Sequence, residues 1–368
     1  MYGSAFTGIG KHVACLIAEL ATKVTPEDGM TFVIFCEHRN VEPIRNLSPI
    51  FEVIGVNIPH YSLREQLIFP YVLGRARLDL MHFPHFNAPI LYRGNIVVTI
   101  HDLILTFYPG KSAVSGFKEF AYKTTLGSVV NKAKRIIAVS KHTKKDLIEL
   151  MGIDEEKITV VYNGVDEVFF EKQSPEKIKE TAKKIGIPGK YLLYLGLHRE
   201  HKNLGRLVRA FGEMVSRGYP GTLVLGGKED PRTNEAREAV RELGLKNRVI
   251  FPGHMDFSDV LPLIQGAEIY VMPSLYEGFG LPILEAMASG VPVAASKTTS
   301  LPEVGGKAVQ YFHPLRVDVM ARAMEEIVKS KRIQAEMIRL GYEQVKKFSW
   351  GKMADETLAT YREVLGKK

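Results

Sequence analysis

The sequence predicts an α/β protein built from two doubly wound parallel sheets. Short apolar runs alternate with polar or helical stretches along the 368-residue chain, and this rhythm is typical of βα units. The length suits two or three domains, and the hydrophobic and charged fractions of 45% and 24% are those of a soluble globular protein. No repeat or low-complexity segment interrupts the pattern. We therefore expect two domains of this type.

The first domain is expected to contain strands that are short and largely apolar. They are predicted at Phe32–Phe35, Val53–Val56, Leu80–Phe83, Ile96–Ile100, Ile136–Val139 and Ile158–Tyr162. A turn signal at Asn163–Asp166 ends this domain. We expect a first domain over 1–168 and a charged linker over 169–189.

A glycine-rich loop precedes the first amphipathic helix. Gly8 and Gly10 in this loop can cradle a phosphate or an acceptor group, although a plain turn explains them equally well. Only Met1 to Phe6 remain to form a strand ahead of the loop. A doubly wound sheet without that strand lacks a central, buried element. Either the N-terminus is truncated or the strand is replaced from elsewhere.

His101 and Asp102 follow the fourth apolar run, just beyond the carboxyl end of a strand, where open α/β sheets bind ligands. His101 can donate to a sugar hydroxyl or a phosphate, with Asp102 orienting its ring. The alternative is a structural histidine whose hydrogen bonds are satisfied internally. His82 and His85 are expected to be mainly structural.

The segment 111–149 is basic, with nine Lys or Arg residues against three Asp or Glu. Aromatic and aliphatic residues, including Phe117 and Phe120, are interleaved with these charges. Such a segment either lies on an anionic bilayer or forms an ordinary helix with a solvated basic face. The net charge of +8 also suggests an anionic partner. Nucleic acid is disfavoured, because no nucleic-acid-binding motif is present.

The second domain is expected over 190–347, followed by a C-terminal amphipathic helix over 348–368 that Trp350 and Tyr361 anchor. Its strands are predicted at Tyr191–Leu195, Thr222–Leu225, Val249–Phe251, Ile269–Met272, Val291–Ala295 and Val309–Phe312. Cys15 and Cys36 are in apolar surroundings without metal-ligand spacing, so we expect reduced core thiols.

The stretch after Met272 predicts an anion site. A loop with Glu277 leads through Gly280 into a helix whose first turn is expected to carry Glu285. The free N–H groups at the helix start, and the close approach that Gly280 permits, suit a diphosphate. Glu285 would then accept from ribose hydroxyls and Glu277 from a sugar. Alternatively, Glu285 only complements the helix dipole and Glu277 is a solvated loop residue.

Two further groups of residues lie at predicted strand ends. Arg199 and Lys202 precede an amphipathic helix, where they either neutralise a bound anion or are ordinary surface charges. The second group either lines a nucleotide-base pocket or forms plain turns. It consists of Gly226, Gly227, His254 and Met255.

The string E-G-F-G-L-P-x-x-E, followed by A-M-A-S-G-x-P-V, resembles the E-x7-E signature of retaining glycosyltransferase family 4. The combination HFPHFNAPI and VVTIHDL resembles the acceptor-domain pattern of mannosyltransferase-like members of that family. The resemblance spans about residues 5 to 365. It implies the GT-B fold, in which two Rossmann-like domains face a central cleft and the last helix crosses back to the first domain.

The resemblance implies metal-independent transfer of a hexose, best matched by mannose from GDP-mannose, to a glycan, lipid-linked or small-molecule acceptor with retention. Glu277, His101, Lys202 and Arg199 would be catalytic. Leu197 stands where relatives carry an arginine, so Arg199 is its substitute. The residues that would bind the donor are Glu285, Gly278, Phe279, Gly280, Leu281, Gly196, Gly226, His254 and Met255.

Other functions stay open at this point. A UDP-sugar donor, UDP-glucose or UDP-GlcNAc, is the alternative within the transferases. Enzymes that epimerise or hydrolyse nucleotide sugars share the fold but lack the glutamate pair. A catalytically inactive, membrane-docked subunit that binds a nucleotide sugar is the alternative of another class. No cofactor besides the donor is expected. The location is expected to be cytoplasmic, with or without peripheral attachment to the inner face of the cell membrane, and the oligomeric state is open.

Overall fold

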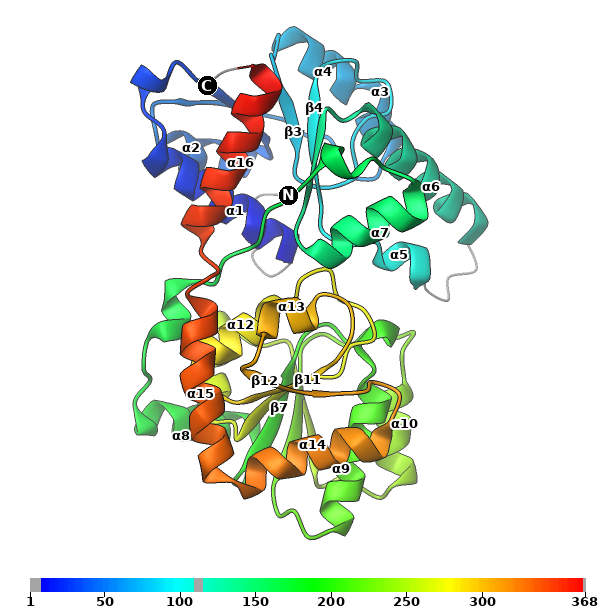
Figure 1. Ribbon diagram of the computed structural model, residues 1–368, viewed down its shortest axis with the longest axis vertical. Coiled ribbons are helices and arrows are strands. Elements are labelled where there is room, and N and C mark those ends of the chain that lie inside the picture. The colour runs from blue at the N-terminus through cyan, green and yellow to red at the C-terminus, as the bar shows by residue number, and fades with distance from the viewer. Residues whose placement is uncertain (1–7, 109–114, 367–368) are drawn as a thin grey trace. The chain divides into compact units, whose positions relative to one another are not determined.

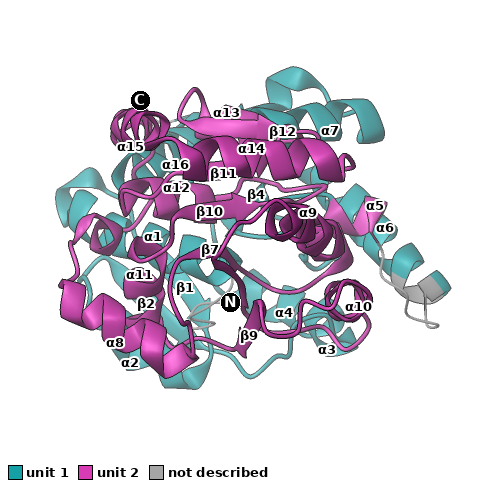
Figure 2. Ribbon diagram, turned by 90° about the horizontal axis from the view of Figure 1, so that it is seen from below, with its two compact units in different colours: residues 1–103, 112–164, 350–368 teal, residues 104–111, 165–349 magenta. Residues whose placement is uncertain are grey.

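The computed structural model describes residues 8–108 and 115–366, which form two compact units (Figures 1 and 2). Unit 1 comprises residues 1–103, 112–164 and 350–368, and unit 2 comprises residues 104–111 and 165–349. Each unit contains parallel β-structure with helices packed on it, as the alternation of apolar runs predicts. The fold class is therefore confirmed. Unit 1 excludes residues 104–111, which lie within the first domain expected over 1–168, so the domain bounds stay a prediction.

Unit 1 contains strands that follow the predicted apolar runs. The strands are β1 (Phe32–Cys36), β2 (Phe51–Gly55), β3 (Met81–Phe83), β4 (Ile96–Ile100), β5 (Arg135–Ala138) and β6 (Ile158–Val160). The helices are α1 (Gly8–Lys23), α2 (Val41–Arg45), α3 (Leu63–Leu67), α4 (Phe69–Arg75), α6 (Ser115–Lys132), α7 (Lys141–Met151) and α16 (Trp350–Leu365). Strand β4 is buried at every position and forms the centre of the core.

The strands of unit 1 form two separate parallel sheets. One pairs β1 with β2, and the other has the order β3-β4-β5-β6. Within residues 8–108 and 115–366, no strand lies between β1 and β3, so each of these strands is paired along one edge only. The expected absence of a strand ahead of α1 stays a prediction. Residues 1–7, where a remnant was sought, lie outside the described part of the chain.

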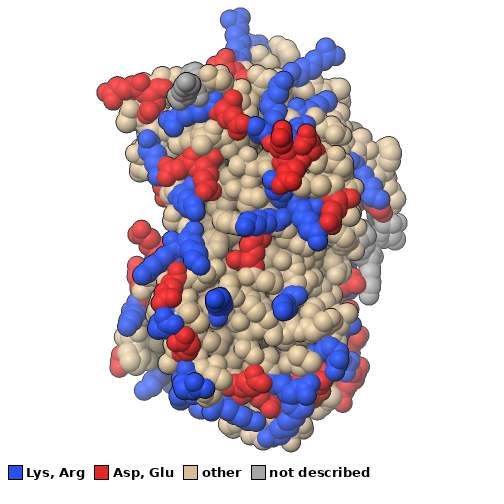
Figure 3. Space-filling view, viewed as in Figure 1, with Lys and Arg blue, Asp and Glu red and all other residues tan. Residues whose placement is uncertain are grey.

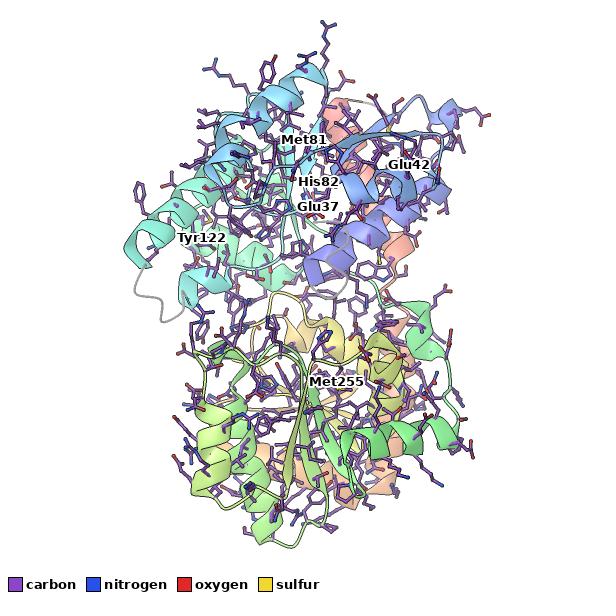
Figure 4. All side chains as sticks on the ribbon, turned by 180° about the vertical axis from the view of Figure 1, so that it is seen from behind. Glu37, Glu42, Met81, His82, Tyr122 and Met255 are labelled. Carbon is purple, nitrogen blue, oxygen red and sulfur yellow. The ribbon has the colours of Figure 1, made fainter. Side chains whose placement is uncertain are left out.

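A cavity of about 640 Å³ lies where these two sheets come closest. Side chains of α1, including Val13 and Leu16, line it together with β1 and β3. Figure 4 shows Met81 and His82 on β3 and Glu37 just beyond β1, and all three line this space. Interiors of proteins are normally packed without voids of this size. The cavity is thus the packing consequence of the divided sheet.

Helix α16 belongs to unit 1 although it is the last element of the chain. It packs against α1, and its Trp350 and Tyr361 are both buried. The Tyr361 hydroxyl lies 2.5 Å from His82 Nδ1, which ties the helix to β3. The expected return of the C-terminal helix to the first domain, and its two anchors, are confirmed.

Unit 2 contains one six-stranded parallel sheet. Its strands are β7 (Tyr191–Leu195), β8 (Thr222–Gly226), β9 (Val249–Gly253), β10 (Ile269–Met272), β11 (Val293–Ser296) and β12 (Val309–Phe312), in the order β12-β11-β10-β7-β8-β9. The helices are α5 (Ile104–Phe107), α8 (Pro175–Ile185), α9 (Leu204–Ser216), α10 (Glu235–Glu242), α11 (Phe257–Gln265), α12 (Leu281–Ala288), α13 (Leu301–Gly305), α14 (Val317–Lys329) and α15 (Lys331–Val345).

The segment expected to be a linker over 169–189 is instead largely the helix α8. Ser174 caps its start by accepting from the Lys177 amide, and Gly186 ends it with a φ of 82°. Ile178, Ala182 and Ile185 recur at i, i+4 and i+7 and are half-buried around the buried Thr181, so the sequence does contain a helical period here that the linker expectation overlooked. The helix packs against α11 and is part of unit 2.

The basic segment 111–149 forms α6, β5 and most of α7. The apolar residues Leu126, Val129 and Val130 of α6 are buried in the core of unit 1. These three side chains do not contact a bilayer, whereas Phe120 of the same helix is exposed, and the choice between a bilayer surface and a solvated basic face stays a prediction. Residues 109–114, and the side chains of Phe117 and Lys118, lie outside the described part.

Candidate functional site

The carboxyl edge of the unit 2 sheet contains a topological switch point. From β7 the chain continues to β8 and β9 on one side, and β10 to β12 lie on the other side. Loops that leave β7 and β10 therefore diverge, and the crevice between them is where open α/β sheets bind ligands. The predicted residues Lys202 and Glu277 lie on these two loops.

Lys202 and Glu277 form an ion pair. Lys202 Nζ lies 2.6 Å from Glu277 Oε1, and the side chains are 17% and 9% exposed. Lys202 ends a 3₁₀ turn (Glu200–Lys202) after β7, while Glu277 lies in the loop after β10. The backbone of Glu277 is held at both ends, because its amide donates to Thr299 Oγ1 and its carbonyl accepts from Ser300 Oγ. The structure thus brings together two residues that are far apart in the sequence.

The two loops are fixed to each other by Asn203. Its side-chain amide donates to the carbonyls of Pro273 and Pro314, at 3.0 and 2.8 Å. Asn203 has a φ of 59°, a left-handed conformation that asparagine tolerates better than most residues. The Leu275 amide also donates to the His201 carbonyl at 2.7 Å. These bonds hold the Lys202 and Glu277 loops in register.

Helix α12 begins at the same crevice. Gly280 caps it with a φ of 106°, and a Cβ at this position would lie 2.8 Å from Leu301. Pro282 has no N–H, and the Ile283 amide donates to the Gly280 carbonyl at 3.0 Å. Of the first three residues of the helix, only the Leu281 amide can therefore bind an anion. Glu285 lies in the second turn and not, as expected, in the first turn, because the helix begins at Leu281. Glu285 is half-buried. The pKa of the Tyr270 phenol is raised mainly by burial, and the nearby Glu285 carboxylate raises it further.

Phe279 differs from the prediction for the donor site. Its ring is buried and packs edge-on against Phe348, with 5.8 Å between ring centroids. Its side chain therefore belongs to the core, and only its backbone can line the site. Gly278 and Gly280 are buried beside it, while Leu281 is half-buried.

The predicted base-pocket residues lie along the ends of β7, β8 and β9. The Gly227 amide donates to the Gly253 carbonyl, and a Cβ at Gly227 would lie 2.0 Å from the Gly196 carbonyl oxygen. Met255 packs beside Gly226, where a Cβ would lie 3.6 Å from Met255 Cγ. Met255 is labelled near this edge in Figure 4. The glycines thus permit close backbone contact between neighbouring strand ends.

Two predicted residues are less constrained. His254 is exposed on the loop after β9, and Arg199 is exposed at the start of the turn that ends at Lys202. The pKa of Asp230 is lowered to about 2, mainly by its hydrogen bonds with Arg232, and Arg199 contributes to this shift. Arg199 therefore lies on the β8 side of the loop, within electrostatic range of Asp230.

In unit 1, a group of histidines gathers at the carboxyl ends of β3, β4 and β6. His101 follows β4, and its Nε2 donates to the Pro84 carbonyl at 2.9 Å. The His12 ring packs edge-on against it, with centroids 4.8 Å apart. His12 Nδ1 donates to Asn163 Oδ1 at 2.8 Å. His85 is the third member, with its ring centroid 6.3 Å from that of His101.

Burial keeps these rings neutral. The pKa of His101 is lowered well below its usual value by burial and by the neighbouring His12 and His85. Burial likewise lowers the pKa of His12, and that of His85 to about 4. Because His101 Nε2 donates to Pro84, Nδ1 of the neutral ring is an acceptor for a hydroxyl. His82 is structural as expected, since both ring nitrogens contact hydroxyls, those of Tyr361 and Thr99.

Three residues of this group were not predicted as site residues: His12, Asn163 and Tyr61. His12 stands two positions after Gly10, and Asn163 was interpreted only as a turn residue. Tyr61 has a φ of 58°, and its hydroxyl lies 2.8 Å from His85 Nε2. No sequence pattern marks these residues, because each reaches the group through a different segment of the chain.

Gly8 and Gly10 lie in the first turn of α1 and not in a loop. Their helical backbone does not require glycine, as neither has a positive φ. The part of the glycine-rich segment that precedes Gly8 lies outside the described residues, so the predicted role in binding a phosphate or acceptor stays a prediction.

Metal-ligand clusters and membrane-spanning helices are both absent from the described residues. Within 8–108 and 115–366, no group of three or more His, Cys, Asp and Glu side chains could hold a metal ion. No helix in the same ranges has the length and apolarity needed to cross a bilayer. Cys15 and Cys36 are free thiols.

Both parts of the chain match models of known families. Residues 160–344 match the model for glycosyl transferases group 1, and residues 6–169 match that for glycosyltransferase family 4. The serotype-specific mannosyltransferase WbdA of Escherichia coli is 31% identical over 307 residues, which cover 81% of this chain and 36% of that protein. The chain belongs to glycosyltransferase family 4.

Two further relatives match this chain over a larger share of their own length. The O-antigen chain mannosyltransferase B of Escherichia coli is 28% identical, over 77% of this chain and 74% of its own. An uncharacterized glycosyltransferase of Methanocaldococcus jannaschii is 28% identical over 63% of this chain and 62% of its own. This member of the family thus spans about a third of the length of WbdA and most of the length of the other two relatives.

Solved structures show the same GT-B fold. A glycosyltransferase from Rickettsia africae has a TM-score of 0.73 at 20% identity and covers 100% of this chain and 98% of its own. The Anabaena protein HepE, solved in complex with UDP and glucose, has a TM-score of 0.72 at 21% identity, with 96% of each chain covered. The architecture expected from the family resemblance is therefore confirmed as two Rossmann-like domains.

Proposed function

We propose that this family member is a retaining glycosyltransferase that moves a hexose from a nucleotide sugar to an acceptor hydroxyl. One observation carries the proposal: the Lys202–Glu277 pair lies at the switch point of the unit 2 sheet, next to the glycine-capped start of α12. A cation, an acceptor of hydroxyl protons and the Leu281 amide at one edge match the diphosphate and the sugar of such a donor.

The charges of unit 2 suit the reaction. When the anomeric C–O bond breaks, its electron pair goes to the leaving diphosphate, and negative charge builds there. Lys202, assisted by Arg199 and the Leu281 amide of α12, would stabilise that charge more strongly in the transition state than in the ground state. Glu277 would orient the sugar hydroxyls and Glu285 the ribose. With this arrangement we propose that no metal ion is needed.

Retention would follow from attack on the same face that the diphosphate leaves. The acceptor oxygen forms a bond with the anomeric carbon as the phosphate oxygen departs. The departing phosphate oxygen takes the proton of the acceptor hydroxyl. This route requires no nucleophile from the protein, and the family resemblance implies it. Product anomers identified by NMR would decide between retention and inversion.

We assign the histidine group of unit 1 to the sugar hydroxyls. A neutral His101 can accept a hydrogen bond through Nδ1 without the energetic cost of burying a charge. The His12 ring packs edge-on against the His101 ring, and His12 is itself hydrogen-bonded to Asn163. These contacts fix the orientation of both rings. A rigid neutral acceptor suits a hydroxyl group better than a phosphate.

GDP-mannose is our proposed donor, and a glycan or a lipid-linked glycan is the proposed acceptor. The relatives named mannosyltransferases at about 30% identity support the transferred sugar. UDP-glucose and UDP-GlcNAc are the alternatives, since the HepE structure holds UDP and glucose. The loops of unit 1 would bind the acceptor.

A ligand screen followed by a transfer assay tests the proposal. Thermal unfolding is measured with GDP-mannose, GDP-glucose, UDP-glucose, UDP-GlcNAc, ADP-glucose and dTDP-glucose, because a ligand of the folded state raises the melting temperature. GDP-mannose is expected to give the largest shift and to support transfer in the presence of EDTA. A larger shift with a UDP-sugar would replace the donor, and EDTA-sensitive transfer would contradict the metal-independent route.

A second candidate is a subunit that binds a nucleotide sugar without transferring it. The divided sheet of unit 1 favours it, because an incomplete acceptor domain can leave the donor domain without a partner substrate. Donor binding without turnover over a broad panel of acceptors would support this candidate, whereas release of any glycosylated product would exclude it.

A further inference from the structure

Helices α3 and α4 of unit 1 present apolar side chains to solvent. Leu63 is 79% exposed, Leu67 65% and Tyr71 66%, and Ile68 between the helices is 47% exposed. Leu91, on a loop that packs against α3, is 62% exposed. A surface helix of a soluble protein normally turns such residues inward. These five residues, which we call the α3–α4 face, therefore form an outward apolar patch.

Polar contacts fix this orientation. Glu65 of α3 is buried, and its carboxylate accepts from the Tyr61 amide at 2.6 Å and from Asn87 Nδ2 at 2.7 Å. Gln66 accepts from the Ile90 amide and donates to the backbone of the same loop. Rotating α3 to bury its leucines would break these bonds and leave a buried carboxylate without donors. The inverted orientation is thus built into the fold.

Four arginines belong to the same stretch of chain as the α3–α4 face. Arg64, Arg75, Arg77 and Arg93 are all exposed, and the only exposed acidic residue within 61–94 is Asp79. The Arg75 guanidinium lies over the Tyr71 ring, 5.9 Å from its centroid. Figure 3 shows Lys and Arg side chains projecting from the part of unit 1 where Figure 1 places α4. Exposed apolar and positive side chains thus occur together on α3 and α4.

We propose that the α3–α4 face docks on the surface of an anionic bilayer. Leucine, isoleucine and tyrosine side chains would enter the boundary between headgroups and acyl chains, and the arginines would pair with lipid phosphates. A second copy of this chain is a poorer occupant, because the arginines of the two copies would repel each other. The α3–α4 face is a larger apolar surface than that of the basic segment 111–149, where Leu126, Val129 and Val130 of α6 pack in the core and Phe120 is exposed.

This inference does not depend on the proposed function, because vesicle binding requires neither donor nor turnover. It adds a location, however. A lipid-linked acceptor would be concentrated in the plane of the same bilayer, so docking would raise its effective concentration. Transfer to a soluble acceptor would be unaffected by the loss of docking.

The test is co-sedimentation of the full chain with vesicles. Phosphatidylcholine vesicles are compared with vesicles that also contain about one third phosphatidylglycerol. The protein is expected to bind the anionic vesicles and to dissociate at high salt. The double variant Leu63→Ser/Leu67→Ser should bind at least about tenfold more weakly, because two leucine side chains no longer leave water. The matched control is Leu150→Ser/Leu315→Ser, two exposed leucines elsewhere, which should bind as the parent does.

Charge and insertion are tested separately. Arg64→Glu/Arg75→Glu should abolish the preference for anionic vesicles. Tyr71→Trp should show a blue shift of tryptophan emission on adding anionic vesicles, above the constant signal of buried Trp350. These substitutions lie on the surface, and unchanged thermal unfolding would verify the fold.

Three results would overturn the proposal. They are absence of binding to anionic vesicles, equal binding by the parent and the Leu63→Ser/Leu67→Ser variant, or an unshifted emission of the vesicle-bound Tyr71→Trp variant. Light scattering adds a fourth: if the parent is a dimer and the leucine variant a monomer with unchanged vesicle binding, the α3–α4 face is a protein interface instead.

Discussion

Lys202 Nζ lies 2.6 Å from Glu277 Oε1, although the two residues come from different loops of the unit 2 sheet. In the absence of a ligand each charge neutralises the other. A bound nucleotide sugar would give both residues new partners. Its diphosphate would attract the Lys202 ammonium, and its sugar hydroxyls would donate hydrogen bonds to the Glu277 carboxylate. The pair is therefore placed to respond to both halves of the proposed donor.

Lys202→Ala should lower kcat about 100-fold or more while donor affinity changes less, because the charge on the leaving diphosphate loses its cation. Lys202→Arg should retain part of the rate. The control is Lys190→Ala, which removes the partner of Glu268 at the other end of β7. Steady-state kinetics checks this, and a Lys202→Ala enzyme with normal kcat would refute the assigned role.

Glu277→Gln should separate recognition of the sugar from recognition of the nucleotide. The amide keeps the size of the side chain but cannot pair with Lys202, so the lysine is free to bind phosphate. We expect the variant to bind the free nucleoside diphosphate as tightly as the parent or more tightly, and the nucleotide sugar more weakly. Calorimetric titration with both ligands measures this. Parallel losses for the two would instead indicate a collapsed loop.

The buried histidines of unit 1 should make the protein acid-sensitive. Folding holds the pKa of His85 near 4 and that of His82 near 3, whereas in the unfolded chain both titrate near 6.5. As pH falls below about 6.5, the unfolded state binds protons that the folded state does not, so stability is lost progressively toward pH 4. At pH 5 the loss is about 2 kcal/mol for each fully shielded histidine.

Urea unfolding at pH 7 and pH 5 measures this loss. His85→Phe should reduce the difference between the two pH values, and His313→Ala, at an exposed position in unit 2, serves as the control. If the parent is equally stable at both pH values, the histidines are not shielded as described.

The cavity between β1 and β3 should tolerate a larger side chain. Val13→Phe directs additional volume into this space and should cost less than about 1 kcal/mol or stabilise the protein. The matched change Val98→Phe, in fully buried β4, should cost about 1–3 kcal/mol because no space is available. Thermal or urea unfolding of the two variants compares them. Equal destabilisation would mean that the cavity is closed in solution.

Periodicity alone predicted the repeating βα pattern and each strand, because a strand buried on both faces must be apolar along its length. The Glu277 loop and the glycine-capped helix were also visible in the sequence, since turn and cap residues act locally. Helix α8 was missed because its many charged residues obscured the i, i+4, i+7 spacing of Ile178, Ala182 and Ile185.

Only the tertiary structure decided which distant residues meet. The ion pair of Lys202 with Glu277, the edge-on packing of His12 against His101 and the burial of Glu65 beneath exposed leucines all depend on segments that are far apart in the chain. Local propensity carries no information about such contacts, because the order of strands in a sheet is set by packing of the whole chain. The sequence by itself thus determined the secondary structure and the class of site, whereas the fold decided which side chains form that site.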